Sequence, residues 1–262
     1  MKHLHLLYTF LLSALLFASC DNISEEERLV YEKPEPAKRV VLLEDFTGQK
    51  CTNCPNANEL IETLQNDFGD NLVVVGIHGG PLGFKGSAKL LGLATEVGDE
   101  YYTHWSLEYQ PVGLINRQGA TDFASWTTKI NEEIKKPTTV NLSLVAATDG
   151  KDIDITTSVL GTEGETVGKL QVYVLEDSIT AMQLMPDKTP NYEYVHNHVF
   201  RMAANGTWGE DITVEEGETI KKSVTVPLNS AWNKDNLSIV AFVYNDNGVV
   251  QAVKAKVVEA QP

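Results

Sequence analysis

Two cysteines stand between an apolar run and a helical pattern, and this arrangement constrains the fold more than any other feature. Residues 40–46 form a near-continuous apolar run, which is typical of a strand covered on both faces of its sheet. Four residues separate this run from Cys51, which begins the sequence Cys51-Thr52-Asn53-Cys54. Beyond Cys54, apolar residues recur at helical spacing as far as Gly69. The sequence therefore predicts a strand, a CxxC pair and a helix in succession.

The chain has three cysteines, and their spacing narrows the chemistry open to this pair. If Cys20 carries lipid, as argued below, Cys51 and Cys54 remain as the pair with no odd thiol. A disulfide across so short a loop contributes only about 2 kcal/mol, which a protein with a large core hardly needs. A zinc site needs four ligands, and the sequence has no second CxxC and no HxxxH. The spacing favours thiol–disulfide chemistry, with no metal or other cofactor.

The N-terminus has the pattern of an export signal. Lys2 precedes an apolar run over residues 4–17, which is shorter than the roughly 20 residues of a good transmembrane helix. The run fits a secretory signal peptide and ends in Leu16-Phe17-Ala18-Ser19-Cys20. This ending resembles the lipobox of bacterial lipoproteins, which implies cleavage after residue 19 and acylation of Cys20 with fatty acids such as palmitate. The alternative is an ordinary signal peptide followed by a chance cysteine.

The charge balance excludes one class of partner and one mode of membrane attachment. There are 36 acidic and 21 basic residues, a formal net charge of −15. Nucleic acid is not an expected partner, because phosphate binding needs clustered Lys and Arg. Adsorption to anionic lipid by charge alone is equally disfavoured, so membrane attachment must be hydrophobic or covalent.

Residues 20–37 read as a tether between the lipid and the folded chain. They are acidic, lack apolar periodicity and contain Pro34 and Pro36, all of which favour a solvated segment. Acidic residues close behind the lipidated cysteine also resemble the surface-export signals of some Gram-negative lipoproteins. A plain solubilising linker explains the same residues equally well.

The order of elements after the tether resembles a known fold. Strands are expected at 72–77 and 112–117, and helices at 87–105 and 122–136. Strand, CxxC, helix, strand, helix, proline, strand and helix together resemble the thioredoxin fold over residues 38–137.

That resemblance implies roles for four residues. Cys51 would be the nucleophile, Cys54 would resolve the mixed disulfide, and Pro111 would form a cis peptide bond against the disulfide. Asp45, six residues before the first cysteine, would accept a proton; its alternative is a strand-end carboxylate that reaches water. Pro55 departs from the family pattern and predicts a helix that starts near residue 53, with Cys51 in the loop ahead.

The second half of the chain has the period of β-structure. Seven strands over residues 138–262 predict an antiparallel, immunoglobulin-like β-sandwich, with a long connection at 177–197. The seven runs are 140–147, 153–159, 170–175, 198–203, 219–226, 237–244 and 249–258. His196 and His198 could share one strand face and bind metal, although hydrogen-bonded structural histidines are favoured because no third ligand is evident.

The complete layout also resembles the twenty-eight-kilodalton outer-membrane lipoprotein family. The resemblance is carried by the lipobox, the acidic tether, the CxxC pair, Pro-Val-Gly-Leu-Ile-Asn-Arg at 111–117 and His-Asn-His-Val-Phe-Arg at 196–201. It implies a lipid-anchored protein of the outer membrane, facing the periplasm or the cell surface.

The sequence thus predicts an α/β thioredoxin-like N-terminal domain and an all-β immunoglobulin-like sandwich C-terminal domain. The expected segments are a signal peptide at 1–19, the tether at 20–37, and the two domains at 38–137 and 138–262. One functional hypothesis is a lipid-anchored thiol–disulfide oxidoreductase acting on disulfides or thiols of exported proteins. The alternative is a non-catalytic binding or interaction lipoprotein with the thioredoxin-like fold as scaffold, since fold does not imply function. The two differ in whether the Cys51 sulfur is exposed.

Overall fold

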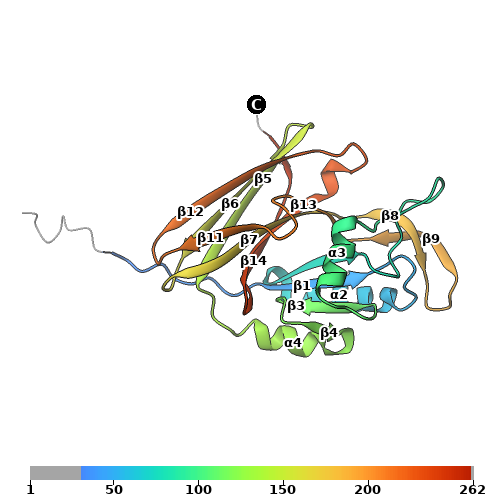
Figure 1. Ribbon diagram of the computed structural model, residues 1–262, viewed down its shortest axis with the longest axis horizontal. Coiled ribbons are helices and arrows are strands. Elements are labelled where there is room, and N and C mark those ends of the chain that lie inside the picture. Colours follow the sequence, from blue (N-terminus) through green and yellow to red (C-terminus); the bar gives the residue numbers. More distant parts are fainter. Residues whose placement is uncertain (1–30, 261–262) are drawn as a thin grey trace, which may run out of the picture. The chain divides into compact units, whose positions relative to one another are not determined.

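One nine-stranded sheet contains strands from both halves of the chain (Figure 1). The computed structural model describes residues 31–260, so Cys20 and the signal peptide expected at 1–19 lie outside the described part. The strand order is β14-β13-β7-β10-β2-β1-β3-β4, with β11 also paired to β7. The first half supplies β1 (Val41–Thr47), β2 (Leu72–His78), β3 (Val112–Ile115) and β4 (Ala120–Asp122). The second half supplies β7 (Thr166–Glu176), β10 (Val199–Ala203), β11 (Glu210–Val214), β13 (Leu237–Asn245) and β14 (Gly248–Lys256).

The two-domain fold class expected from the sequence is wrong. Strand β2 is buried along its whole length, and β10 from the second half pairs with its free edge, where the Gly76 N–H donates a 2.8 Å hydrogen bond to the His198 carbonyl. An unpaired edge would leave a row of buried backbone groups without partners. The apolar core is also shared, since Phe46 and Val73 belong to the same cluster as Tyr173 and Phe242. No self-contained thioredoxin-like α/β domain is present among residues 31–260, which are mainly β-structure.

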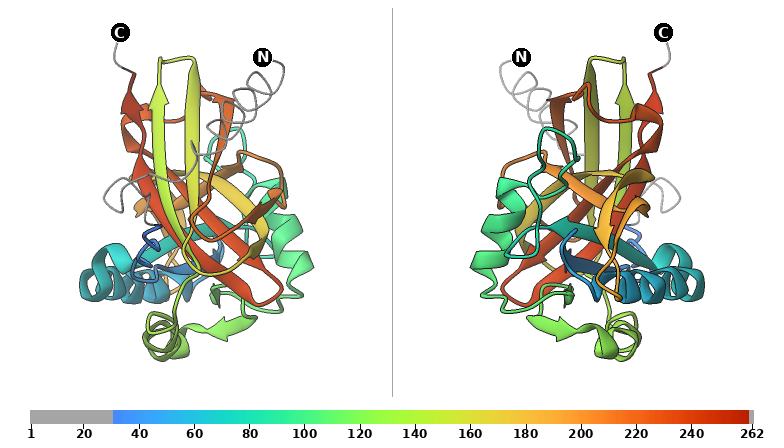
Figure 2. Two further views of the ribbon diagram at one scale, coloured as in Figure 1. Left: turned by 90° about the vertical axis from the view of Figure 1, so that its left-hand side faces the viewer. Right: turned by 90° about the vertical axis from the view of Figure 1, so that its right-hand side faces the viewer.

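A second sheet covers part of the first. Its order is β12 (Thr219–Pro227), β6 (Asp152–Gly161), β5 (Val140–Thr148) and β15 (Val258–Glu259). Its inward side chains, such as Ile153 and Ile155, share a core with Val172 and Ile239 of the large sheet, and Figure 2 shows β5 and β6 in yellow-green beside β14 in red. The packing is sandwich-like, but the facing strands belong to the sheet that contains β1. The expected separate immunoglobulin-like domain is therefore wrong as well.

The long connection expected at 177–197 is instead a β-hairpin. Strand β8 (Ile179–Leu184) pairs in antiparallel register with β9 (Pro190–His196) as a two-stranded sheet of its own. The Leu184 N–H donates a 2.9 Å hydrogen bond to the Gln49 carbonyl. This bond fastens the hairpin to the loop that carries the CxxC pair.

Three α-helices flank the large sheet in the described residues. Helix α2 (Cys54–Phe68) and helix α4 (Trp126–Glu133) pack on one apolar cluster with β1, and α3 (Glu96–His104) packs through Tyr101 and Tyr102 on another. Short 3₁₀ turns lie at Gly69–Asn71, Phe123–Ser125 and Lys234–Asn236. Within residues 31–260, none of the helices has the length and apolar character needed to cross a membrane.

Helix α3 is much shorter than the helix expected at 87–105. Residues 79–95 form a loop in which Gly86 and Gly92 meet so closely that a Cβ on Gly92 would lie 2.0 Å from the Gly86 nitrogen. The helix begins after Thr95, whose side chain accepts a 2.9 Å hydrogen bond from the Gly98 N–H. The loop therefore depends on glycines that a helical pattern does not reveal.

Candidate functional site

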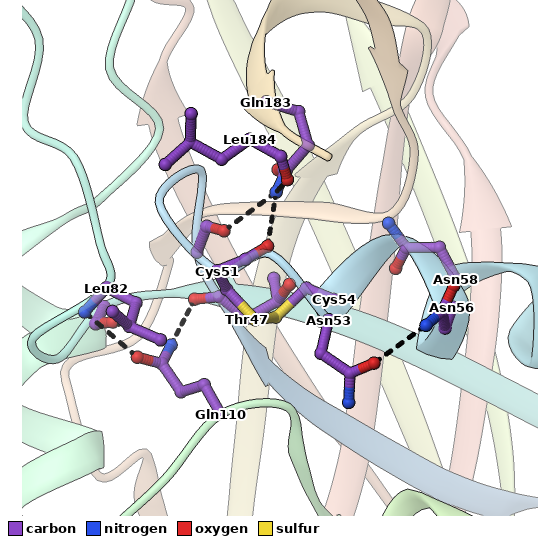
Figure 3. Close-up of a disulfide and its surroundings, with 12 residues drawn as sticks. Thr47, Cys51, Asn53, Cys54, Asn56, Asn58, Leu82, Gln110, Gln183 and Leu184 are labelled. Atoms are coloured by element: carbon purple, nitrogen blue, oxygen red, sulfur yellow. Dashed lines mark hydrogen bonds between the residues drawn. A yellow bond between two sulfur atoms is a disulfide. The ribbon is translucent and has the colours of Figure 1, made fainter. Parts of the chain in front are cut away.

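Cys51 and Cys54 form a disulfide at the start of helix α2, with an S–S distance of 2.06 Å (Figure 3). Cys51 lies in the loop after β1, where its N–H donates a 3.0 Å hydrogen bond to the Gly48 carbonyl. Cys54 is the first helical residue, with Pro55 in the first turn, where proline is well tolerated. Each cysteine is only 1% exposed, so neither sulfur offers an open surface to a second protein.

The β8–β9 hairpin covers this disulfide loop. Gln183 of β8 donates from Nε2 to the carbonyl oxygens of Cys51, at 2.8 Å, and Gly48, at 3.3 Å (Figure 3). Gln183 is itself 1% exposed, so these bonds lie in a water-poor environment where each unmade bond is costly. Sequence reasoning missed Gln183, because no neighbouring residue marks a contact with a loop far away in the chain.

Gln49 joins the disulfide loop to two further segments. Its buried side chain donates to the carbonyl oxygens of Met182, at 2.9 Å, and Leu91, at 3.0 Å. Its Oε1 accepts a 2.8 Å hydrogen bond from the Leu93 N–H. One side chain therefore links the CxxC loop to the hairpin and to the glycine-rich loop 79–95.

Pro111 lies directly before β3, in a chain segment that the side chain of Gln110 holds in place. The Gln110–Pro111 peptide bond is cis, and Pro111 is buried. The Gln110 side chain donates to the Thr47 carbonyl at 2.6 Å and accepts from the Leu82 N–H at 3.2 Å (Figure 3). It also donates to the Gly79 carbonyl at 3.0 Å. Thr47 is the last residue of β1, directly before the loop that carries the cysteines, so this segment supports the loop from the side of β3.

Asp45 contributes to a small cavity beside β1 rather than reaching water. The cavity has a volume of about 40 Å³, and its lining includes Asp45, His78 and His196. Asp45 is 1% exposed and its Oδ1 has no hydrogen-bond partner within the protein. The His78 Nδ1 and His196 Nε2 atoms are likewise buried and unpaired. Because a water needs only roughly 10–15 Å³ of such volume, this polar cavity has room for ordered water to satisfy them.

Burial sets the ionisation of these three side chains. Burial raises the pKa of Asp45 to about 7. It lowers the pKa of His196 to about 4, and burial together with His196 and Arg201 lowers that of His78. The two imidazole rings meet edge to face with centroids 5.3 Å apart. The polar cavity therefore holds neutral histidines at neutral pH.

His196 and His198 do not share a strand face. Both residues line the polar cavity, but His196 ends β9, whereas His198 lies in the turn before β10 with a φ of 57°. The His198 Nδ1 lies 3.1 Å from Asp177, and its Nε2 lies 3.0 Å from the Gln65 Oε1. No cluster of three His, Cys, Asp or Glu side chains suited to a metal ion occurs in residues 31–260.

A second, much larger hollow lies at the far end of α3. It has a volume of about 610 Å³ and is called here the aromatic groove. Four ring side chains and several polar groups line it. They come from the end of α3, the loop after β3, the start of β7, the β10–β11 loop with the start of β11, and the end of β13 with the turn after it. The lining residues are His104, Trp105, Arg117, Val167, Gly168, Lys169, Trp208, Asp211, Tyr244, Asn245 and Asp246.

Comparison with known proteins decides the family. The model of the family described as outer membrane protein Omp28 matches residues 98–261. The chain belongs to the Omp28 outer membrane protein family. This membership confirms the expected outer-membrane lipoprotein family and its location at the outer membrane. A search of the curated proteins finds no match.

Solved structures show a shared fold at low identity. HBP35 of Porphyromonas gingivalis superposes with a TM-score of 0.67 at 14% identity, covering 86% of this chain and 80% of its own. Protein AGR_C_4864 from Agrobacterium tumefaciens gives a TM-score of 0.53 at 17% identity, covering 87% and 98%. A domain of the outer membrane lipoprotein Omp28 from Porphyromonas gingivalis is 28% identical over 47% of this chain and 92% of that domain, with a TM-score of 0.35. The first two similarities show that this chain shares the fold of those two proteins.

Proposed function

We propose that this Omp28-family member is a non-catalytic binding lipoprotein of the outer membrane, in which the Cys51–Cys54 disulfide is a structural clamp. The observation that carries the proposal is the 1% exposure of both cysteines beneath the hairpin. Thiol–disulfide exchange requires a thiolate to approach a disulfide sulfur directly, and a covered sulfur does not allow this. The alternative function, a thiol–disulfide oxidoreductase, would require the β8–β9 hairpin to move away from the disulfide before each substrate could reach its sulfur atoms.

The position of the family match supports the same conclusion. The match begins at residue 98, after both cysteines, and it includes Trp105, Trp208 and Tyr244 of the aromatic groove. The matched residues therefore include the whole lining of the aromatic groove and neither cysteine.

The disulfide stabilises the fold in two ways. A disulfide across four residues contributes about 2 kcal/mol by restricting the unfolded chain. It also holds the loop whose carbonyls at Gly48 and Cys51 accept from Gln183, and whose Gln49 side chain contacts two other segments. The bond therefore stabilises a junction of three segments.

Attachment to the membrane belongs to the N-terminal segment that precedes strand β1. We infer that residues 1–19 are removed as a signal peptide and that acyl chains on Cys20 anchor the protein through the tether at 20–37. Two or three acyl chains suffice for stable anchoring, whereas one alone holds weakly. The folded part would then face the periplasm or the cell surface, where its partner is an exported molecule.

A trapping experiment tests the non-catalytic role. In Cys54→Ser, an exchange enzyme would accumulate mixed disulfides through Cys51, whereas a clamp leaves Cys51 covered and unreactive. We expect no mixed disulfide with exported proteins and slow alkylation of Cys51 by iodoacetamide. The matched control is Asn53→Cys in a Cys51→Ser/Cys54→Ser background, which places a thiol at an exposed position of the same loop. Alkylation of Cys51 as fast as this control, or accumulation of mixed disulfides, would overturn the proposal.

A further inference from the structure

The aromatic groove has the size and composition of a site for a small ligand. Its volume of about 610 Å³ lies within the roughly 300–1,000 Å³ of ligand pockets. Trp105, Trp208 and Tyr244 are each half-buried, so part of every ring belongs to the groove and part to the protein. Half-buried indole and phenol rings offer apolar surface beside polar groups, as ligand sites do.

The rings of the groove are held in place before any ligand arrives. The Trp208 Nε1 donates a 3.0 Å hydrogen bond to the Glu100 carboxylate, and the Tyr244 hydroxyl donates a 2.7 Å bond to the Trp208 carbonyl. The Trp208 ring also lies 4.2 Å from the His104 ring and 5.1 Å from the Tyr101 ring, measured between centroids. A fixed platform loses little conformational entropy on binding, which favours affinity.

Arg117 supports the floor of the groove from beneath Tyr244. Its guanidinium lies 4.4 Å from the Tyr244 ring centroid and 4.7 Å from that of Phe242. The Nη1 atom is buried and has no hydrogen-bond acceptor within the protein. Because this guanidinium is buried, Arg117 holds the Tyr244 ring in place through the stacking contact and does not itself offer an exposed donor to a ligand.

Most charged groups of the groove are already paired, although the chain as a whole carries a net charge of −15. Arg117 is paired with the buried Glu44, and Lys169 is paired with Asp211 at 2.6 Å. Asp246 is the remaining charged side chain of the lining. Asn245 adds an amide to the rim. A strongly charged ligand would gain little here, and a wholly apolar ligand would desolvate the polar rim without replacing its hydrogen bonds.

We propose that the aromatic groove binds a neutral oligosaccharide. The C–H face of a pyranose ring packs on an aromatic face, while its hydroxyls donate to carboxylates and accept from ammonium and amide groups. The half-buried rings supply the first kind of contact, and Lys169, Asn245 and Asp246 supply the second. This assignment rests on the proposed binding role and names its ligand class, and the two are tested by different measurements. Trapping at Cys51 tests whether the protein is non-catalytic, and sugar binding tests whether the ligand is a neutral oligosaccharide.

The chain contains internal reporters for a test with neutral trisaccharides. The sequence has four tryptophans, of which Trp105 and Trp208 line the groove. Trp126 is fully buried in another core cluster, and Trp232 packs against Arg201 with a ring-to-guanidinium distance of 5.5 Å. With 15N-labelled indoles, titration with maltotriose, cellotriose or mannotriose to millimolar concentrations should shift the Trp105 and Trp208 Nε1–H signals of the disulfide-bonded protein in a saturable way. The Trp126 and Trp232 signals should stay in place.

Two substitutions locate the binding. Trp208→Ala should weaken trisaccharide binding at least about 10-fold, a typical loss when an aromatic anchor is removed. Because this variant loses a ring from the core, Asp246→Ala at the exposed rim is the second, and its expected loss is about 5-fold. Asp67→Ala, an exposed aspartate on α2, is the matched control and should bind as the unmodified protein does. The assignment is overturned if no trisaccharide shifts the groove signals, if Trp126 or Trp232 responds instead, or if Asp246→Ala and Asp67→Ala bind equally.

Discussion

Arg117 and Glu44 form a bidentate ion pair inside the protein. The Arg117 Nε and Nη2 atoms each lie 3.0 Å from a different oxygen of the Glu44 carboxylate, and both side chains are 1% exposed. The guanidinium also donates a 2.6 Å hydrogen bond to the Tyr173 hydroxyl of β7. Although burial opposes its charge, the adjacent Glu44 raises the pKa of Arg117. This cluster joins β1 and the turn after β3 to a strand from the second half of the chain.

Removing one partner of this pair should destabilise the protein strongly. Glu44→Gln leaves a buried guanidinium without its counter-charge, for which we expect a loss of about 3–5 kcal/mol in the free energy of unfolding. Urea denaturation followed by circular dichroism measures this loss. The matched control is Glu132→Gln, which breaks an exposed pair with Lys129 and should cost less than about 0.5 kcal/mol. Similar losses in the free energy of unfolding in both variants would show that the buried pair stabilises the protein no more than the exposed pair does.

The contact between Gln183 and the CxxC loop predicts the accessibility of the disulfide. Gln183→Ala removes the hydrogen bonds to the Cys51 and Gly48 carbonyls and loosens the hairpin over the sulfurs. Losing bonds worth about 1.4 kcal/mol in the closed state would raise the open fraction about tenfold. Reduction by dithiothreitol, followed by thiol alkylation and mass spectrometry, should therefore be about tenfold faster.

Thr180→Ala is the control for this measurement, because Thr180 is an exposed residue of the same strand. Its disulfide should be reduced at the rate of the unmodified protein. Equal rates in Gln183→Ala and Thr180→Ala would contradict a covering role for the hairpin.

Local patterns predicted the elements around the disulfide closely. The apolar run at 40–46 is strand β1 at Val41–Thr47, and the run at 72–77 is β2 at Leu72–His78. Pro55 predicted a helix start near residue 53, and α2 begins at Cys54 with Asn53 as its N-cap. Such features depend on residues next to one another in the sequence, which is why periodicity and proline chemistry reveal them.

The joining of the two halves depends on contacts that no local pattern contains. Periodicity shows that β2 and β10 are strands but not that residue 199 pairs with residue 76. The burial of Cys51 likewise depends on Gln183, which lies 132 positions further along the chain. Trp105, Trp208 and Tyr244 come from separate segments, so the aromatic groove exists only after folding.

The buried carboxyl of Asp45 predicts a distinct pH dependence of stability. Burial raises its pKa from an ordinary value near 3.8 to about 7, so the folded state holds a proton that the unfolded state has released. Its unfavourable contribution is absent below pH 3.8, grows as the pH rises and is complete above pH 7. Asp45→Asn should therefore raise the free energy of unfolding at pH 8 by roughly 2–4 kcal/mol and change it little at pH 4.

The comparison must be made as a difference between variant and unmodified protein at each pH. His78 and His196 line the same cavity, and their lowered pKa values reduce stability as the pH falls, which is the opposite sign. The difference removes this common contribution in thermal or urea unfolding curves. Asp67→Asn on the surface should give a difference near zero at every pH. A flat difference for Asp45→Asn would show that its carboxyl ionises normally when folded.

Cys20, which lies before the described residues, should carry the acyl chains that anchor the protein. Burial of an acyl chain in the bilayer contributes about 0.8 kcal/mol per methylene, so two or three chains anchor a protein stably. Without them, the net charge of −15 would be repelled by anionic lipids. Metabolic labelling with radioactive palmitate should mark the unmodified protein and not Cys20→Ala. Residues 21–262 exported behind an ordinary cleavable signal should appear in the soluble fraction, because that protein has no acyl chain. The Cys51→Ser/Cys54→Ser variant is the control and should stay labelled and membrane-bound. If Cys20→Ala still takes up palmitate, or if the protein with the exchanged signal sediments with the membranes, another part of the chain is the anchor.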